Sequence, residues 1–310
     1  MRLLRCSSDS AGFSLVELFK EDIPPYAILS HTWGSDEDEV TFSDLRDEQA
    51  KTISGYSKLV FCSEQAAKDK IEFFWIDTCC IDQSSSAELT EAINSMYKWY
   101  QQAEKCYVLL SDVEIDVPLE DISDEQWAQM FHKSRWFQRG WTLQEMLAPK
   151  VVEFFSKTGI PLGDKVTLLQ ALHLRTQVPQ FALQNGPLEH FSIDDRISWM
   201  NGRQTKREED AAYSLLGVCG TNMSLIYGEG REKALMRLRK KAERSVHDKV
   251  PRNPPRARRW TVPFQREMDF HHRDCLEQVS KICSQTAGWA SLSGPARVGY
   301  VRPFLSAIQC

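Results

Sequence analysis

The chain has 310 residues, 42% of them hydrophobic, which suffices for one large domain or two small ones and excludes a chain disordered throughout. Its net charge of −5 is unevenly divided, because residues 231–259 carry +9 and leave −14 for the rest. An acidic body repels phosphate backbones, so we expect no nucleic-acid binding by the main domain.

The N-terminus has no long apolar run and no small-residue cleavage site, and no stretch of the chain is apolar enough to cross a bilayer. The nine cysteines are an odd number in a large chain without a secretion signal, which favours reduced thiols over a disulfide framework. We therefore expect a protein of the cytosol or nucleus, and assign it to the cytoplasm.

Short apolar runs alternate with helical patterns along the first half of the chain. The runs predict strands, and the patterns between them predict helices at 57–70, after Ser85 and at 141–147. The four predicted strands are 26–30, 71–76, 105–110 and 151–155, of which 26–30 is taken as the first. This alternation predicts a mainly parallel sheet with helices on both faces.

Two regions follow from the sequence pattern over residues 1–262. Residues 1–245 form the predicted main domain, in which the segment from about 164 to 241 is a helical cap. Residues 246–262 form a linker rich in Pro and Arg, because such a sequence cannot build a regular helix or a central strand. The basic residues before and within it form either a solvated helix face and a disordered linker or a contact for acidic partners or lipids.

The first candidate motif is Ser30-His31-Thr32-Trp33-Gly34, at the predicted carboxyl end of the first strand. Ligands of parallel α/β sheets bind beyond such ends, so Ser30, His31, Trp33 and Gly34 are candidate substrate-binding residues. The glycine permits a tight backbone there. A histidine in a loop also serves structural roles, and that alternative stays open for His31.

The second motif, residues 77–83, also follows a strand. Asp77 is placed to accept hydrogen bonds from a ribose or to order neighbouring loops. The adjacent Cys79 and Cys80 are interpreted as small buried hydrophobes. They lack the Cys-x-x-Cys spacing of a zinc site, and we expect no metal in this chain.

The third motif, residues 134–145, combines two tryptophans and two arginines with Glu145 on a short predicted helix. Trp136 and Trp141 offer flat surfaces on which a base can stack, and the Arg139 guanidinium can bind phosphate. A glutamate beside apolar surface can have its pKa tuned for catalysis. The alternative is an ion pair between Arg139 and Glu145 at a helix end, with the tryptophans in the core.

Taken together, these motifs resemble the fungal heterokaryon incompatibility (HET) domain over about residues 26–240. The resemblance rests on five segments, which are 26–34, 75–83, 139–145, 210–217 and 225–234. It implies a role in non-self recognition and the cell death that follows fusion of incompatible cells. Self-association and a NOD-like or other incompatibility partner are the expected interactions.

A more distant resemblance is to the Toll/interleukin-receptor (TIR) domain, through Ser134-x-Trp136 and residues 141–146, with an insertion between the two halves. It implies a flavodoxin-like α/β fold. In TIR domains that hydrolyse NAD the matching glutamate is catalytic, so the resemblance assigns that role to Glu145, with NAD as substrate and no bound cofactor. A non-catalytic module that signals by self-association is the alternative function.

Residues 263–310 resemble the entry to a NOD-like NTPase module. Gly294 and Gly299 keep the spacing of a phosphate loop, but Tyr300 and Val301 stand where its Lys and Ser or Thr belong. We interpret the segment as a degenerate or truncated NTPase start. A regulatory fragment left by loss of the NTPase is a third reading of the chain.

Overall fold

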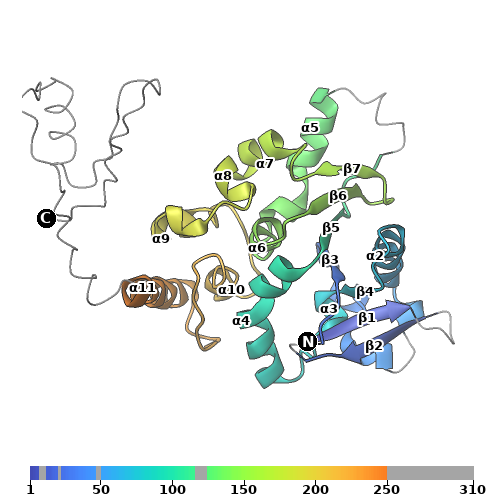
Figure 1. Ribbon diagram of the computed structural model, residues 1–310, viewed down its shortest axis with the longest axis horizontal. Coiled ribbons are helices and arrows are strands. Elements are labelled where there is room, and N and C mark those ends of the chain that lie inside the picture. The colour runs from blue at the N-terminus through green and yellow to red at the C-terminus, as the bar shows by residue number, and fades with distance from the viewer. Residues whose placement is uncertain (7–11, 20–21, 47–49, 116–123, 250–310) are drawn as a thin grey trace, which may run out of the picture. The chain divides into compact units, whose positions relative to one another are not determined.

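The computed structural model describes residues 1–6, 12–19, 22–46, 50–115 and 124–249 (Figure 1). The strands are β1 Arg2–Cys6, β2 Phe13–Glu17, β3 Tyr26–His31, β4 Phe73–Trp75, β5 Lys105–Leu110, β6 Val152–Ser156 and β7 Pro161–Asp164. The helices are α1 Phe42–Arg46, α2 Tyr56–Lys68, α3 Asp77–Cys80, α4 Ser86–Gln102, α5 Asp124–Lys133, α6 Thr142–Leu147, α7 Leu169–Thr176, α8 Gln180–Leu183, α9 Ile193–Ser198, α10 Asp210–Tyr213 and α11 Arg231–Lys249.

Helix α11 runs through the first four residues of the expected linker, 246–249. The rest of that linker and the segment 263–310 lie outside the described residues. None of the helices within the described ranges is long and apolar enough to cross a membrane.

One sheet of seven strands, in the order β2-β1-β4-β3-β5-β6-β7, forms the centre of the domain. Strands β4, β3, β5 and β6 are parallel, while β1, β2 and β7 join antiparallel at the two edges. The parallel centre has the strand order of a flavodoxin-like fold. The α/β, flavodoxin-like prediction is thus confirmed.

The expectation that residues 26–30 are the first strand is wrong, because β1 and β2 precede them. Each is five residues long, and β1 carries arginines at Arg2 and Arg5. Such a strand has little apolar periodicity of its own. It is stabilised by pairing, β1 with both β2 and β4, which places Leu3 and Leu4 in the core.

Helices cover both faces of the sheet, with α2 on one side and α4 on the other (Figure 1). Phe61 of α2 packs edge-on against Phe155, with ring centroids 5.2 Å apart. On the opposite side the Tyr100 hydroxyl of α4 donates a hydrogen bond of 3.0 Å to the Leu29 carbonyl. Because side chains alternate along a strand, Ser30 and His31 at the end of β3 face opposite layers.

The start of α4 is fixed by Ser85, as its spacing predicts. The Ser85 hydroxyl accepts a hydrogen bond from the Glu88 backbone N–H. The Glu88 carboxylate accepts from the Asp82 backbone N–H at 2.8 Å and forms an ion pair with Arg2 of β1. This glutamate therefore ties the loop before α4 to the first strand.

The turn before α11 depends on two glycines and one glutamate. Gly228 and Gly230 have φ of +94° and +82°, a conformation that favours glycine. Their N–H groups donate to the same Glu209 carboxylate oxygen at 2.7 and 2.9 Å. The turn places α11 beside α10 and α9.

Gly217 lets the segment after α10 approach α4 closely, and we expect Gly217→Ala to destabilise the domain by about 3 kcal/mol. A Cβ atom at this position would lie 2.0 Å from Cβ of Tyr97. Urea unfolding measures the effect. The control is Gly202→Ala, where nothing lies within 4 Å and only a left-handed φ of +75° is strained, at about 1 kcal/mol. Equal costs for the two variants would contradict the close approach.

Candidate functional site

A cavity of about 200 Å³ lies beyond the carboxyl ends of β3 and β4. Its walls come from the loops after those strands, from α4 and α6, and from residues 206–227. The lining residues are Trp33, Asp77, Ile81, Gln83, Leu89, Ile93, Met96, Arg139, Trp141, Glu145, Lys206, Arg207, Asp210 and Tyr227. Five of them, Trp33, Asp77, Arg139, Trp141 and Glu145, are candidates from the sequence.

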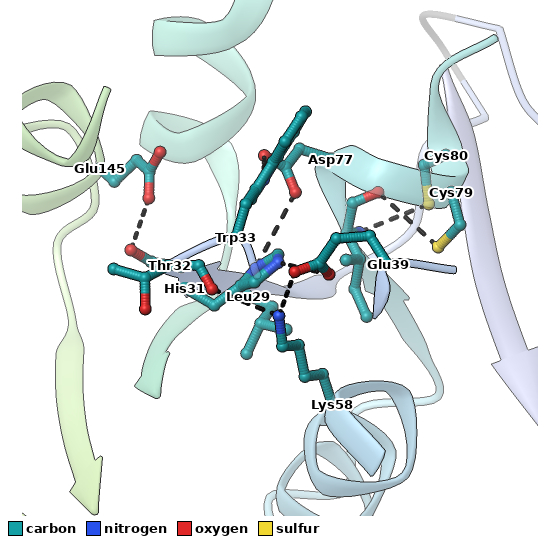
Figure 2. A network of polar contacts seen from close by, with 12 residues as sticks. Leu29, His31, Thr32, Trp33, Glu39, Lys58, Asp77, Cys79, Cys80 and Glu145 are labelled. Atoms are coloured by element: carbon teal, nitrogen blue, oxygen red, sulfur yellow. Dashed lines mark hydrogen bonds and ion pairs between the residues drawn. The ribbon is translucent and has the colours of Figure 1, made fainter. Parts of the chain in front are cut away.

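Glu145 lies on the inner wall of this cavity and is held by residues behind it. The Ser30 hydroxyl donates a hydrogen bond of 2.5 Å to Oε2 of Glu145, and Trp136 Nε1 donates one of 2.8 Å to the same hydroxyl. Figure 2 shows the Glu145 carboxyl pointing toward the end of β3. Ser30 and Trp136 are fully buried and do not line the cavity, so they fix the position of Glu145.

Burial, with the nearby Asp77 carboxylate as a second cause, raises the pKa of Glu145 to about 8. Hydrogen bonding by Ser30 and the positive charge of Arg139 oppose this rise. At pH 7 the carboxyl is therefore mainly protonated. Among the described residues no ion pair joins Glu145 to Arg139, so the alternative of a helix-end ion pair does not describe this geometry.

Trp33 is held at the cavity wall by two polar neighbours. Its Nε1 donates a hydrogen bond of 2.9 Å to Oδ2 of Asp77, and the Arg139 guanidinium lies 5.5 Å from the centre of its ring. Asp77 is about 20% exposed and turns its other oxygen, Oδ1, toward Nδ1 of His31 at 3.9 Å. Asp77 therefore orients Trp33 in addition to lining the cavity.

His31 does not line the cavity and lies beside Glu39 and Lys58 of α2 (Figure 2). It is 4% exposed, and its Nε2 lies 3.5 Å from Oε2 of Glu39. Glu39 also pairs with Lys58 of α2 and accepts a hydrogen bond of 2.6 Å from the Gly34 N–H. In this structure His31 and Gly34 shape the loop after β3, which is the structural alternative for His31.

An acidic stretch such as 36–39 is typical of a solvated loop, but Glu39 is only 5% exposed. Burial disfavours its charge, but His31, Lys58 and the Gly34 N–H together lower the pKa of Glu39 to about 2. The loop folds back because this carboxylate has three partners inside the domain. Asp36, Glu37 and Asp38 are exposed as expected.

Cys79 and Cys80 are buried free thiols of α3, the short helix that begins at Asp77. The Ile76 N–H donates a weak hydrogen bond of 3.4 Å to the Cys80 sulfur. Burial raises the pKa of the Cys79 thiol, so it is an inert neutral group at physiological pH. Both cysteines fill space in the core, as interpreted from the sequence.

The helical cap supplies four cavity residues that the sequence reasoning missed: Lys206, Arg207, Asp210 and Tyr227. The Tyr227 hydroxyl donates a hydrogen bond of 3.1 Å to Asp210, and the Arg207 guanidinium lies 4.2 Å from the centre of the Tyr227 ring. Burial raises the pKa of Asp210. Two of the four lie in the segments 210–217 and 225–234, whose recurrence in a family was the available signal.

The comparisons with known proteins agree with the motifs. The family model described as heterokaryon incompatibility protein (HET) matches residues 26–126. The vegetative incompatibility protein HET-E-1 of Podospora anserina is 55% identical over 241 residues, which cover 78% of this chain and 18% of that protein. The chain thus spans less than a fifth of the length of that relative.

No solved structure matches the chain. The family match begins at the first residue of β3 and includes the loop that carries Trp33 and the helix α3 that begins at Asp77. The chain therefore carries a domain of the heterokaryon incompatibility family.

Proposed function

We propose that this chain is the effector domain of a vegetative incompatibility system and that it promotes cell death by cleaving NAD in the cavity around Glu145. The incompatibility part of the proposal is supported by the similarity to a protein named for that function. The expected cytoplasmic location, self-association and a NOD-like partner belong to the same proposal.

The observation that carries the NAD proposal is the buried carboxyl of Glu145 in a cavity that also presents cations and flat rings. Arg139, Lys206 and Arg207 can neutralise a diphosphate, while Trp33 and Trp141 offer surfaces for a planar base. The carboxyl groups of Glu145 and Asp77 lie where a cationic nicotinamide ribose would be favoured. NAD combines these three kinds of group in one molecule.

In the proposed reaction the bond between ribose C1′ and the nicotinamide nitrogen breaks, and its electron pair leaves with neutral nicotinamide. The ribose then carries positive charge, which an ionised Glu145 stabilises. Water adds to C1′ and releases one proton. Ser30 donates to the Glu145 carboxyl and Trp136 donates to Ser30, so both act by positioning Glu145.

The direct test incubates purified protein with NAD and follows free nicotinamide over a range of protein concentrations. Release that rises more than proportionally with concentration supports cleavage by clustered domains. If clustered protein releases no nicotinamide, the reading as a non-catalytic self-associating module replaces this proposal.

The pH profile should show cleavage increasing toward alkaline pH. The ionised form of Glu145 is the active form, and its pKa in the free protein is about 8. We therefore expect kcat/KM to rise about tenfold per pH unit between pH 6 and 8 and to level off above pH 8. Nicotinamide release measured over pH 6 to 9, with the melting temperature at each pH, checks this. A flat or falling profile would contradict the assigned protonation state.

A further inference from the structure

A second cavity, of about 190 Å³, lies on another side of α4 and is separate from the one around Glu145. Tyr97 and Gln101 of α4 line it, whereas Met96 lines the first cavity. At about 30 Å³ per water molecule, its volume corresponds to roughly six waters, the size of a small organic molecule. Nothing in the proposed reaction uses this cavity.

Arg196 of α9 brings a positive charge to this cavity without a counter-ion. The residue is only 4% exposed, and among the described residues it forms no ion pair. Its Nη1 donates a hydrogen bond of 3.1 Å to the Val218 carbonyl, and its Nε donates one of 3.4 Å to the Ser192 carbonyl. Its Nη2 donates none to the described residues. A buried guanidinium with an unused donor is a site for an anion.

Glu189 brings the opposite charge to the same cavity. The charges of Glu189 and Arg196 shift the pKa of Tyr97 in opposite directions. The pKa of Tyr97 is raised to about 12, mainly by burial, with Glu189 contributing to the rise and Arg196 opposing it. Yet Glu189 and Arg196 do not pair with each other in the described structure. Opposite charges that share a cavity without touching leave room for a molecule that carries both.

Polar and apolar groups complete the surroundings of this cavity. The Asn185 amide is already used, since it donates hydrogen bonds of 3.0 Å to the Leu147 and Pro149 carbonyls. Leu147 and Val218 supply apolar surface. The cavity thus offers a cation, an anion and an apolar wall.

We propose that this second cavity binds a free α-amino acid of small or medium size. The carboxylate of the amino acid accepts a hydrogen bond from Nη2 of Arg196. Its ammonium group faces Glu189, and its side chain lies against Leu147 and Val218. The helix α6 and the segment 210–220 line both cavities, so a bound amino acid contacts the elements that carry Glu145 and Asp210. The binding itself does not depend on the NAD proposal.

The test measures binding of glycine, L-serine and L-leucine to the full chain by calorimetry and thermal shift. We expect saturable binding of at least one of them. For L-leucine the single-charge analogues are 4-methylpentanoate, which lacks the ammonium, and 3-methylbutylamine, which lacks the carboxylate; each should bind at least tenfold more weakly. Glu189→Gln and Arg196→Gln should weaken binding of the amino acid by at least tenfold, whereas Glu64→Gln on α2 should not.

Glu189 is exposed, so its variant should stay folded and remain informative if Arg196→Gln does not fold. Three results would each overturn the proposal. They are the absence of saturable binding by all three amino acids, equal binding of a single-charge analogue, and unchanged binding by folded Glu189→Gln. A purely structural Arg196 would give the first result together with a lower melting temperature for Arg196→Gln.

Discussion

Glu145→Gln should lower nicotinamide release by at least about a hundredfold while the domain stays folded. The amide keeps the size of the side chain and can accept the hydrogen bond from Ser30, but it cannot carry the negative charge that a cationic ribose transition state requires. Nicotinamide release at matched protein concentrations measures the loss. The control is Glu153→Gln on β6, which removes an ion pair to Lys105 away from the cavity and should leave the rate unchanged.

The same substitution should also change how stability depends on pH. The pKa of Glu145 is about 8 in the folded protein and ordinarily about 4.5, so folding favours the protonated form. The native state then binds more protons than the unfolded state between these values, and wild-type stability falls as pH rises from 4.5 to 8. A glutamine does not titrate. The melting temperature of Glu145→Gln relative to wild type should therefore increase from pH 5 to pH 8.

These two measurements separate the roles of Glu145. Equal cleavage by wild type and Glu145→Gln would refute the catalytic assignment even if the pH dependence of stability is as expected. If Glu145→Gln loses activity and its melting temperature also falls strongly, the carboxyl is instead required for the stability of the fold. The catalytic role of Glu145 therefore requires that Glu145→Gln is folded and inactive.

Ile76→Asp should abolish soluble folding. Ile76 directly follows β4 and is 1% exposed, next to the fully buried Trp75. An aspartate there would place a charge in the core without a partner, which costs more than about 4 kcal/mol and exceeds the reserve of many domains. Expression in the soluble fraction and a circular dichroism melt measure the outcome.

The matched control for this prediction is Ile226→Asp. Ile226 is 49% exposed, so the same change of side chain should leave most of the stability in place. A soluble Ile76→Asp variant with a cooperative melt close to that of wild type would show that the position is not in the core. Failure of both variants would point to a general intolerance of acidic substitutions.

The sequence alone determined the centre of this domain and its family. The four parallel strands were predicted within about two residues of their observed ends, and the cap at Ser85 was found, because both depend on local patterns. A run of apolar residues marks a strand buried on both faces, and a side-chain oxygen three residues before a helical N–H marks a helix start. The placement of Asp77 and Trp33 beside a cavity followed from their positions after parallel strands.

Only the tertiary structure decided which candidates meet. Ser30 and Glu145 are 115 residues apart and are joined by one hydrogen bond, while His31, the next residue after Ser30, faces the opposite layer. Asp210 and Tyr227 reach the cavity because the cap folds back over α4, a docking that depends on Gly217 fitting against Tyr97. The antiparallel strands β1 and β2 and the buried Glu39 follow the same rule. Each is stabilised by partners distant in the sequence, which a local pattern does not contain.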